Sequence, residues 1–142
     1  GEGMTGISCR EGSCTEEEKE NVRDIFSSCG RVEMVEERLM DAVGCVSGSS
    51  PAFVYMFIEA LADGGVKYGL PRKTAYAMAA QTVLGSAKMI LETGKHPGQL
   101  KDEVCSPGGT TIAGVSALEE HGLRNALIKA ADACYEKTQS MK

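Results

Sequence analysis

The stretch Ala52-Phe-Val-Tyr-Met-Phe-Ile-Glu-Ala-Leu-Ala62 decides the fold class of this chain. Within it only Glu59 is charged, only Tyr55 carries a hydroxyl, and the other residues are apolar. A helix that is apolar almost all round is buried on most of its sides, and an exposed apolar surface of that size usually marks an interface. This helix is therefore expected to lie either against a second protein surface or under other helices of the same chain.

Helical patterns continue on both sides of this stretch. Apolar residues recur at helical intervals from Leu39 to Val46, which predicts a helix from Glu37 onward. The run Ser47-Gly-Ser-Ser-Pro51 is predicted to interrupt it, with the proline in the first turn of the next helix. Prolines and glycines bound the further predicted helices, which are residues 72–93, a short turn over 96–104, a helix from Thr110–Thr111 to Glu120, and a last helix after Gly122.

The beginning of the chain shows a β-α-β pattern instead. Met4–Cys9 and Arg31–Val35 are the predicted strands. Thr15 is predicted to begin the helix between them, because Glu18 three residues later completes a capping box. Gly30 is predicted to end that helix in the left-handed conformation. Two strands and one helix do not make a stable sheet alone, so we expect this part to be the remnant of a larger sheet.

Composition excludes several classes of function. A net charge of −5 and a pI near 5.1 argue against a nucleic-acid surface, and no apolar run is expected to reach the length of a membrane span. The six cysteines include no C-x-x-C pair and only two histidines are present, so no metal site is predicted. Several cysteines fall at apolar helix positions, where a free thiol acts as a small hydrophobe, which favours a reducing, cytoplasmic location.

A glycine-rich loop carries the strongest chemical signal. Ser106-Pro-Gly-Gly109 forms a tight bend, and Thr110-Thr-Ile112 opens an amphipathic helix. A helix start leaves backbone N–H groups unpaired beside the positive end of the helix dipole, where an anion binds well. The threonine hydroxyls can donate and accept hydrogen bonds beside it. The loop therefore fits a small carboxylate or phosphate, although the same residue types also make an ordinary turn followed by a capped helix.

Four motifs stand out along the chain, and they are Ser47–Pro51, Glu59–Gly65, Gly69–Arg72 and Lys101–Gly114. They resemble the C-terminal half of pyrroline-5-carboxylate reductase, and they keep that family's order and spacing from about residue 35 to residue 138. The resemblance implies that residues 1–36 end a Rossmann-type dinucleotide-binding domain and that residues 37–142 form a helical dimerisation and substrate-binding domain, so that the fold class is mainly α.

The resemblance also implies an activity. Members of this family reduce pyrroline-5-carboxylate to L-proline with NADPH or NADH, the last step of proline biosynthesis, and they form homodimers or higher homo-oligomers. The glycine loop that holds most of the cofactor is expected to lie outside this chain, so the chain by itself is expected to be inactive.

Residue roles follow from the same resemblance. The family's carboxylate pocket corresponds to Ser106, Gly109, Thr110 and Thr111. Thr111 matches the threonine that donates to the ring nitrogen of the substrate, which makes it the expected catalytic residue, and we assign the helix cap to Thr110. Glu37 matches an acidic position near the ribose of the cofactor.

Two positions depart from the family pattern, and two other readings stay open. Ser50 stands where many relatives have glycine, and Glu103 stands where a neutral residue is frequent, so Glu103 is given no role.

One alternative function is a non-catalytic helical dimerisation module that binds a small anion. The other is the helical domain of a hydroxyacid dehydrogenase relative, for which Lys88 is the candidate lysine.

Overall fold

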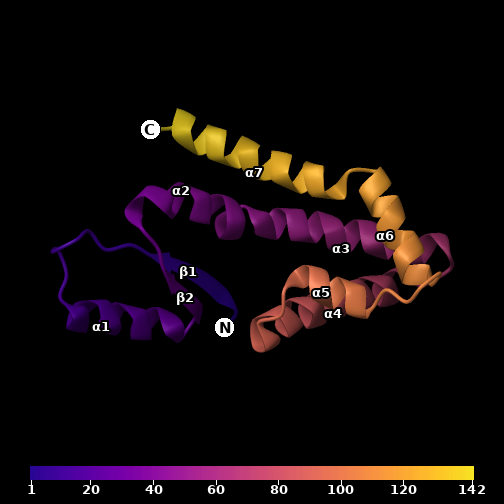
Figure 1. Ribbon diagram of the computed structural model, residues 1–142, viewed down its shortest axis with the longest axis horizontal. Helices are drawn as coiled ribbons and strands as arrows, with labels where there is room; N and C mark the ends of the chain where they lie inside the picture. The colour runs from indigo at the N-terminus through magenta and orange to yellow at the C-terminus, as the bar shows by residue number, and fades with distance from the viewer. The chain divides into compact units, whose positions relative to one another are not determined.

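The computed structural model describes residues 1–142 (Figure 1). The chain divides into two compact units. The first unit contains Gly1–Pro51 together with Lys129–Lys142, and the second contains Ala52–Ile128. One small sheet lies in the first unit, and helices make up most of the rest. The predicted fold class, mainly α with a short β-α-β segment first, is confirmed.

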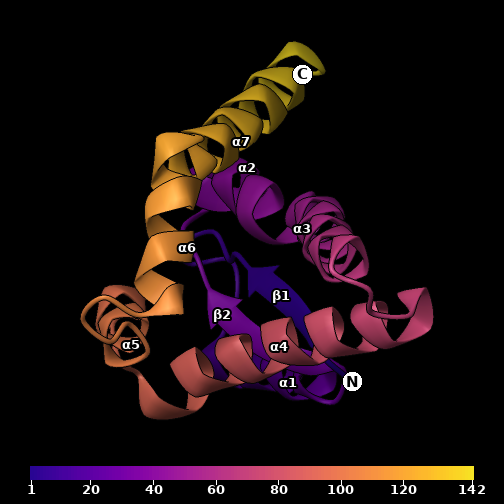
Figure 2. The same cartoon turned by 90° about the vertical axis from the view of Figure 1, so that its right-hand side faces the viewer.

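The first unit begins with the predicted β-α-β segment, whose two strands lie side by side in Figure 2. Strand β1 (Gly3–Ile7) pairs in parallel with β2 (Gly30–Met34), so that Gly3 lies opposite Gly30 and Ile7 opposite Met34. Helix α1 (Glu16–Ser27) connects them. The predicted strands existed, but each lies one or two residues earlier than expected.

Gly30 does not end helix α1, and that prediction was wrong. The helix closes at Ser28, which keeps a right-handed helical conformation. Gly30 is the first residue of β2, with a φ of +154°, and a Cβ there would overlap the backbone nitrogen and oxygen of Gly3. The glycine is therefore required by the close approach of two strands rather than by a helix end.

The capping box at the start of α1 is confirmed. The Glu18 amide donates to the Thr15 hydroxyl at 3.2 Å, and the Thr15 amide donates to the Glu18 carboxylate at 2.8 Å. The second bond, and a third from the Thr15 hydroxyl, hold the pKa of Glu18 below its ordinary value of 4.5. Both ends of the box therefore satisfy amides that a helix start leaves free.

This box predicts an acid-sensitive helix start. Because the pKa of Glu18 is lowered on folding, its contribution is complete above about pH 4.5 and is lost as the pH falls through the lowered value. Glu18→Gln should remove that pH dependence. Thr15→Ala should keep most of it, since the Thr15 amide remains, but should cost about 1 kcal/mol at any pH. Hydrogen–deuterium exchange of the α1 amides at pH 7 and pH 4 measures both effects; equal pH dependence in Glu18→Gln and the parent would contradict the assignment.

The helical run that follows is continuous, which corrects the predicted interruption at residues 47–51. A 3₁₀ turn, η1 (Glu37–Leu39), leads into α2 (Met40–Val43), a π-helical turn, η2 (Gly44–Gly48), and α3 (Ser50–Lys67). Pro51 lacks the amide that would continue the α-helical pattern. The wider π turn accommodates it, and the Ser50 hydroxyl donates to the Cys45 carbonyl at 2.8 Å. Pro51 does lie in the first turn of α3, as predicted.

This continuity also changes the expectation about membrane spans. Residues Glu37–Lys67 form one helical run of 31 residues that is long and apolar enough to cross a membrane by length and composition. This run was not predicted, because the serine-glycine segment at residues 47–51 was expected to divide residues 37–67 into two shorter helices. One run of this kind is weak evidence for a span, since the core helix of a soluble protein meets the same criteria.

The second unit is a set of helices around an alanine core. It contains most of α3, then α4 (Arg72–Thr93), α5 (Pro97–Glu103) and α6 (Thr110–Glu120). Helix α4 has the predicted bounds, with Gly94 closing it at a φ of +64°. The buried side chains are those of Ala62 from α3 and Ala75 and Ala79 from α4. Small side chains allow the two helix backbones to approach closely.

The last helix, α7 (Leu123–Ser140), begins in the second unit and ends in the first. In the first unit its end is held by Asp41, which accepts hydrogen bonds from Gln139 at 2.6 Å and Lys142 at 2.5 Å.

The cysteines differ from the expectation of free thiols at one place. Cys9 and Cys14 form a disulfide, and the other four cysteines are free. This pair was not predicted, because the spacing of Cys9 and Cys14 matches no metal-binding or redox motif.

Candidate functional site

The loop between α5 and α6 is a tight turn built by glycine. The Gly109 amide donates to the Ser106 carbonyl at 3.0 Å, and Gly108 has a φ of +69°, as the third residue of a type II turn requires. A Cβ at Gly109 would overlap the Ser106 hydroxyl oxygen. Glycine at this position therefore leaves room for the serine hydroxyl beside the helix start.

The start of α6 presents free backbone donors. The amides of Thr110, Thr111 and Ile112 donate to no acceptor in the chain, and the first amide to do so is that of Ala113, which reaches the Gly109 carbonyl at 3.4 Å. No side chain caps this helix, because its N-cap is Gly109. The free amides and the helix dipole together form a site for an anion.

The assignment of the cap to Thr110 was wrong. Thr110 is the first residue of α6 rather than its cap, and its hydroxyl makes no hydrogen bond. The N-cap is a glycine, a residue that is also favoured there although it offers no side chain. The Thr111 hydroxyl likewise has no partner, and both threonines are exposed. Each hydroxyl is therefore free to contact a ligand.

Charged side chains near this loop are paired with one another. Glu103 accepts from the Lys95 ammonium at 2.8 and 3.0 Å and from Gln99 at 3.0 Å, and the Lys95 contact lowers the pKa of Glu103. Lys101 pairs with Asp102 at 2.5 Å, which raises the pKa of Lys101. None of these groups bonds to Ser106–Thr111. The donors that the loop itself offers an anion are its backbone amides and its hydroxyls.

Glu37 belongs to the first unit, whereas Ser106, Gly109, Thr110 and Thr111 are brought together in the second. Glu37 opens η1, and one of its carboxylate oxygens accepts from the Ser8 hydroxyl at 2.7 Å. Its other oxygen accepts no hydrogen bond. Ser8 is not among the residues predicted from the sequence. A signal for it was present, because ligand-contacting residues gather after the carboxyl ends of parallel strands and Ser8 directly follows β1.

Lys88, the candidate lysine of the dehydrogenase alternative, is exposed on α4. Its ammonium lies 3.5 Å from the Glu92 carboxylate one helical turn later. This is an ordinary surface pair within one helix, and it gives no support to a role for Lys88 opposite a substrate.

A parallel β-α-β segment followed by helices is the architecture expected where a Rossmann-type domain ends and a helical domain begins. Comparison with known proteins makes this specific. Residues 37–141 match the family model described as pyrroline-5-carboxylate reductase dimerisation. The chain belongs to the pyrroline-5-carboxylate reductase family.

Individual relatives agree with this result. The chain is 52% identical over 139 residues to the pyrroline-5-carboxylate reductase of Escherichia coli, covering 98% of this chain and 51% of that protein. It is 51% identical over 130 residues to the enzyme of that name from Glycine max, covering 92% of this chain and 47% of that protein. The chain thus spans about half the length of the curated relatives it matches.

Solved structures show the same fold. The chain is similar to the pyrroline-5-carboxylate reductase of Coxiella burnetii with a TM-score of 0.92 and 34% identity, over 98% of this chain and 52% of that one. It is similar to the Plasmodium falciparum pyrroline carboxylate reductase with NADP bound, with a TM-score of 0.84 and 37% identity, over 96% of this chain and 52% of that one.

Proposed function

We propose that this chain forms the substrate-binding and dimerisation part of an enzyme that reduces pyrroline-5-carboxylate to L-proline. The observation that carries the proposal is the Ser106–Thr111 loop. Its three free amides suit the substrate carboxylate, and its two unpartnered threonine hydroxyls lie at the same helix start. Membership of the family supplies the reaction.

The amides of the loop, the Ser106 hydroxyl and the Thr111 hydroxyl each have a role in the proposed reaction. The amides at the start of α6 bind the carboxylate, and the Ser106 hydroxyl, next to Gly109, adds a donor. The Thr111 hydroxyl donates to the ring nitrogen and orients the imine. The amides and hydroxyls are donors that need no change of protonation.

The cofactor in this proposal is NADPH or NADH, which supplies the hydride when bound. A relative of this chain has NADP bound. The Glu37 carboxylate is suited to contact such a cofactor, because one oxygen is held by Ser8 while the other is free to accept from a ribose hydroxyl. Ser8 would thereby fix the direction of the free oxygen.

The proposed functional form is a homodimer or a higher homo-oligomer. Val54, Phe57 and Leu61 lie on one face of α3 and remain 39%, 42% and 45% exposed, and Tyr55 and Met56 are each 69% exposed. An apolar surface of this extent is usually covered by protein. The family model that matches residues 37–141 describes a dimerisation domain, which favours a second copy of this chain as the cover.

The direct test is an assay of the full-length protein. Oxidation of NADPH or NADH should depend on added pyrroline-5-carboxylate and should yield L-proline. Binding of L-proline to the protein without turnover would instead support the anion-binding dimerisation module. Absence of both activities would overturn the proposal.

Gly109→Ala tests the carboxylate pocket separately. The new methyl group would displace the Ser106 hydroxyl, while the backbone conformation at residue 109, with a φ of −78°, is open to alanine. We therefore expect a rise of about tenfold in the substrate KM, as for loss of one hydrogen bond to a charged group. Ser106→Ala should give a similar rise, and the double variant should add little to either. Fully additive effects in steady-state kinetics would contradict this coupling.

A further inference from the structure

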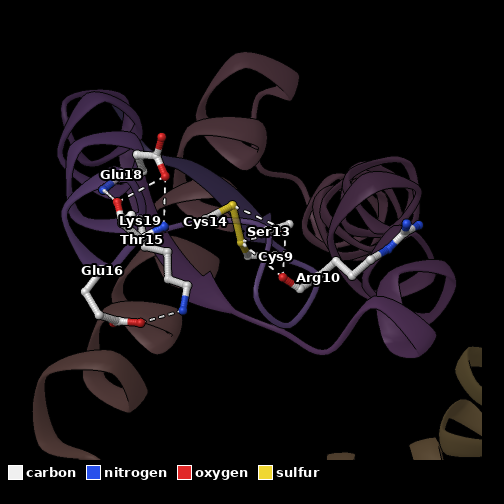
Figure 3. Close-up of polar contacts among 8 residues, drawn as sticks. All are labelled: Cys9, Arg10, Ser13, Cys14, Thr15, Glu16, Glu18 and Lys19. Atoms are coloured by element: carbon white, nitrogen blue, oxygen red, sulfur yellow. Dashed lines mark hydrogen bonds and ion pairs between the residues drawn. A yellow bond between two sulfur atoms is a disulfide. The ribbon is translucent and has the colours of Figure 1, made fainter.

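The loop between β1 and α1 holds two cysteines together by means of its own backbone. Cys9 and Cys14 are joined, with their Cα atoms 6.6 Å apart (Figure 3). Between them the Ser13 amide donates to the Arg10 carbonyl at 3.0 Å, and Gly12 turns the chain with a φ of +74°. The hydrogen-bonded turn would keep the two sulfurs close even without the covalent bond.

A hydroxyl lies beside both sulfurs. The Ser13 oxygen is 3.6 Å from the sulfur of Cys9 and 3.6 Å from that of Cys14, and it donates to the Arg10 carbonyl at 2.6 Å. After reduction, a thiol at either position can donate to this oxygen, and the hydroxyl can rotate to donate to a thiolate. The oxidised and reduced forms of the loop therefore both have hydrogen-bond partners.

The cross-link should stabilise the fold less than a disulfide that closes a long loop. It closes a loop with a sequence separation of only 5, and short loops give the smallest entropic gain from a disulfide. Helix α1 starts independently of it, because the bonds between Thr15 and Glu18 involve no sulfur (Figure 3). Breaking the disulfide should therefore leave the β-α-β segment folded.

We propose that Cys9 and Cys14 form a reversible dithiol–disulfide site that exchanges with small thiols and disulfides of the glutathione class. In the oxidising direction, one cysteine thiolate attacks a sulfur of the small disulfide, whose S–S bond breaks and releases one small thiolate. The second cysteine thiolate then attacks the protein-bound sulfur and releases the other. Two protein thiols are oxidised, one small disulfide is reduced to two thiols, and the reverse reaction consumes two small thiols.

The other cysteines are poorer candidates for this exchange. Cys45 is buried, and burial raises the pKa of its thiol, which lowers its thiolate fraction. Cys29 is exposed but is not paired with another cysteine. Only Cys9 and Cys14 combine a surface loop with a second sulfur at bonding distance. If the protein is in a reducing cytoplasm, as the sequence predicts, the reduced dithiol should be the predominant form.

The test uses the full-length protein equilibrated in glutathione buffers from fully reduced to fully oxidised. Free thiols are then alkylated under acid quench, and the protein is digested with trypsin without reduction. Cleavage after Arg10 and Lys19 separates the two cysteines, so the disulfide appears as a peptide ending at Arg10 linked to Glu11–Lys19. We expect this linked pair to change from the predominant to a minor form as reduced glutathione increases, and to return on oxidation, with an unchanged circular dichroism spectrum.

Cys14→Ser is the matched control. It leaves Cys9 with no partner, so only a mixed disulfide with glutathione should form there, as at Cys29. Three results would overturn the proposal: alkylation of both cysteines in every buffer, a linked pair that survives every buffer, or unfolding on reduction. The first would mean that no disulfide forms, and the others that it is a structural cross-link. None of these results bears on reductase activity, so the test is independent of the proposed function.

Discussion

Replacing Thr111 with alanine in the full-length protein should lower turnover by about ten- to a hundredfold, or about 1.5–3 kcal/mol. The substitution removes a hydroxyl that has no partner within the chain, while the amides that bind the carboxylate remain. If the hydroxyl bonds most strongly as the ring nitrogen gains its proton, kcat should fall more than substrate affinity. Steady-state kinetics with pyrroline-5-carboxylate measures both quantities.

Two further variants make this result specific. Thr111→Ser keeps the hydroxyl and should recover most of the activity. Thr110→Ala is the comparison one residue earlier: its hydroxyl caps nothing, so thermal stability should stay near that of the parent, and turnover should fall much less than in Thr111→Ala because the Thr110 amide remains. If Thr110→Ala abolished turnover while Thr111→Ala did not, the roles of the two threonines would be reversed. If neither mattered, the loop would be only a turn.

Replacing Phe57 with aspartate should prevent assembly. Phe57 lies between Val54 and Leu61 on the exposed apolar face of α3, where a second copy of the chain would bury it. A charge without a partner in such an interface is strongly unfavourable. Because obligate dimers often lack a stable folded monomer, we expect insoluble or unfolded protein rather than a soluble folded monomer. Analytical ultracentrifugation and circular dichroism of the soluble fraction measure this.

Asn125→Asp places the same charge on a polar, exposed position of α7 and should leave assembly unchanged. A folded dimer of Phe57→Asp with normal stability would show that this face is not an interface. A folded monomer would show that the chain does not need its partner to fold.

Much of the helical fold could be predicted because its signals are local. Pro71 and Gly94 bound α4, and both act through the backbone of a few neighbouring residues. The capping box at Thr15 is equally local, since it joins residues three positions apart. The Ser106–Gly109 bend is also local, because the order serine, proline, glycine, glycine is typical of a tight turn, and the sequence alone therefore predicts the candidate substrate loop.

Several features that were not predicted depend on a neighbour that is distant in sequence or on an unusual backbone conformation. Gly30 is needed because Gly3 lies opposite it in the sheet, and Ser8 reaches Glu37 across 29 positions. No periodic pattern reports such contacts. The π turn before Pro51 looked like a break because serine and glycine commonly end helices. Thr110 was predicted to cap α6 because threonine is a preferred N-cap residue, but the N-cap is the preceding residue, Gly109.

The alanine core of the second unit restricts how this domain can change during evolution. Most cores are damaged when a large side chain is shortened and a cavity opens. The three alanine side chains are too small to leave a large cavity if shortened. Ala62, Ala75 and Ala79 are only 1%, 3% and 4% exposed, so a substitution damages this core by making the side chain larger. Any larger side chain at these positions would push α3 and α4 apart. Sequence drift in this part of the chain is therefore limited by steric overlap rather than by loss of buried area.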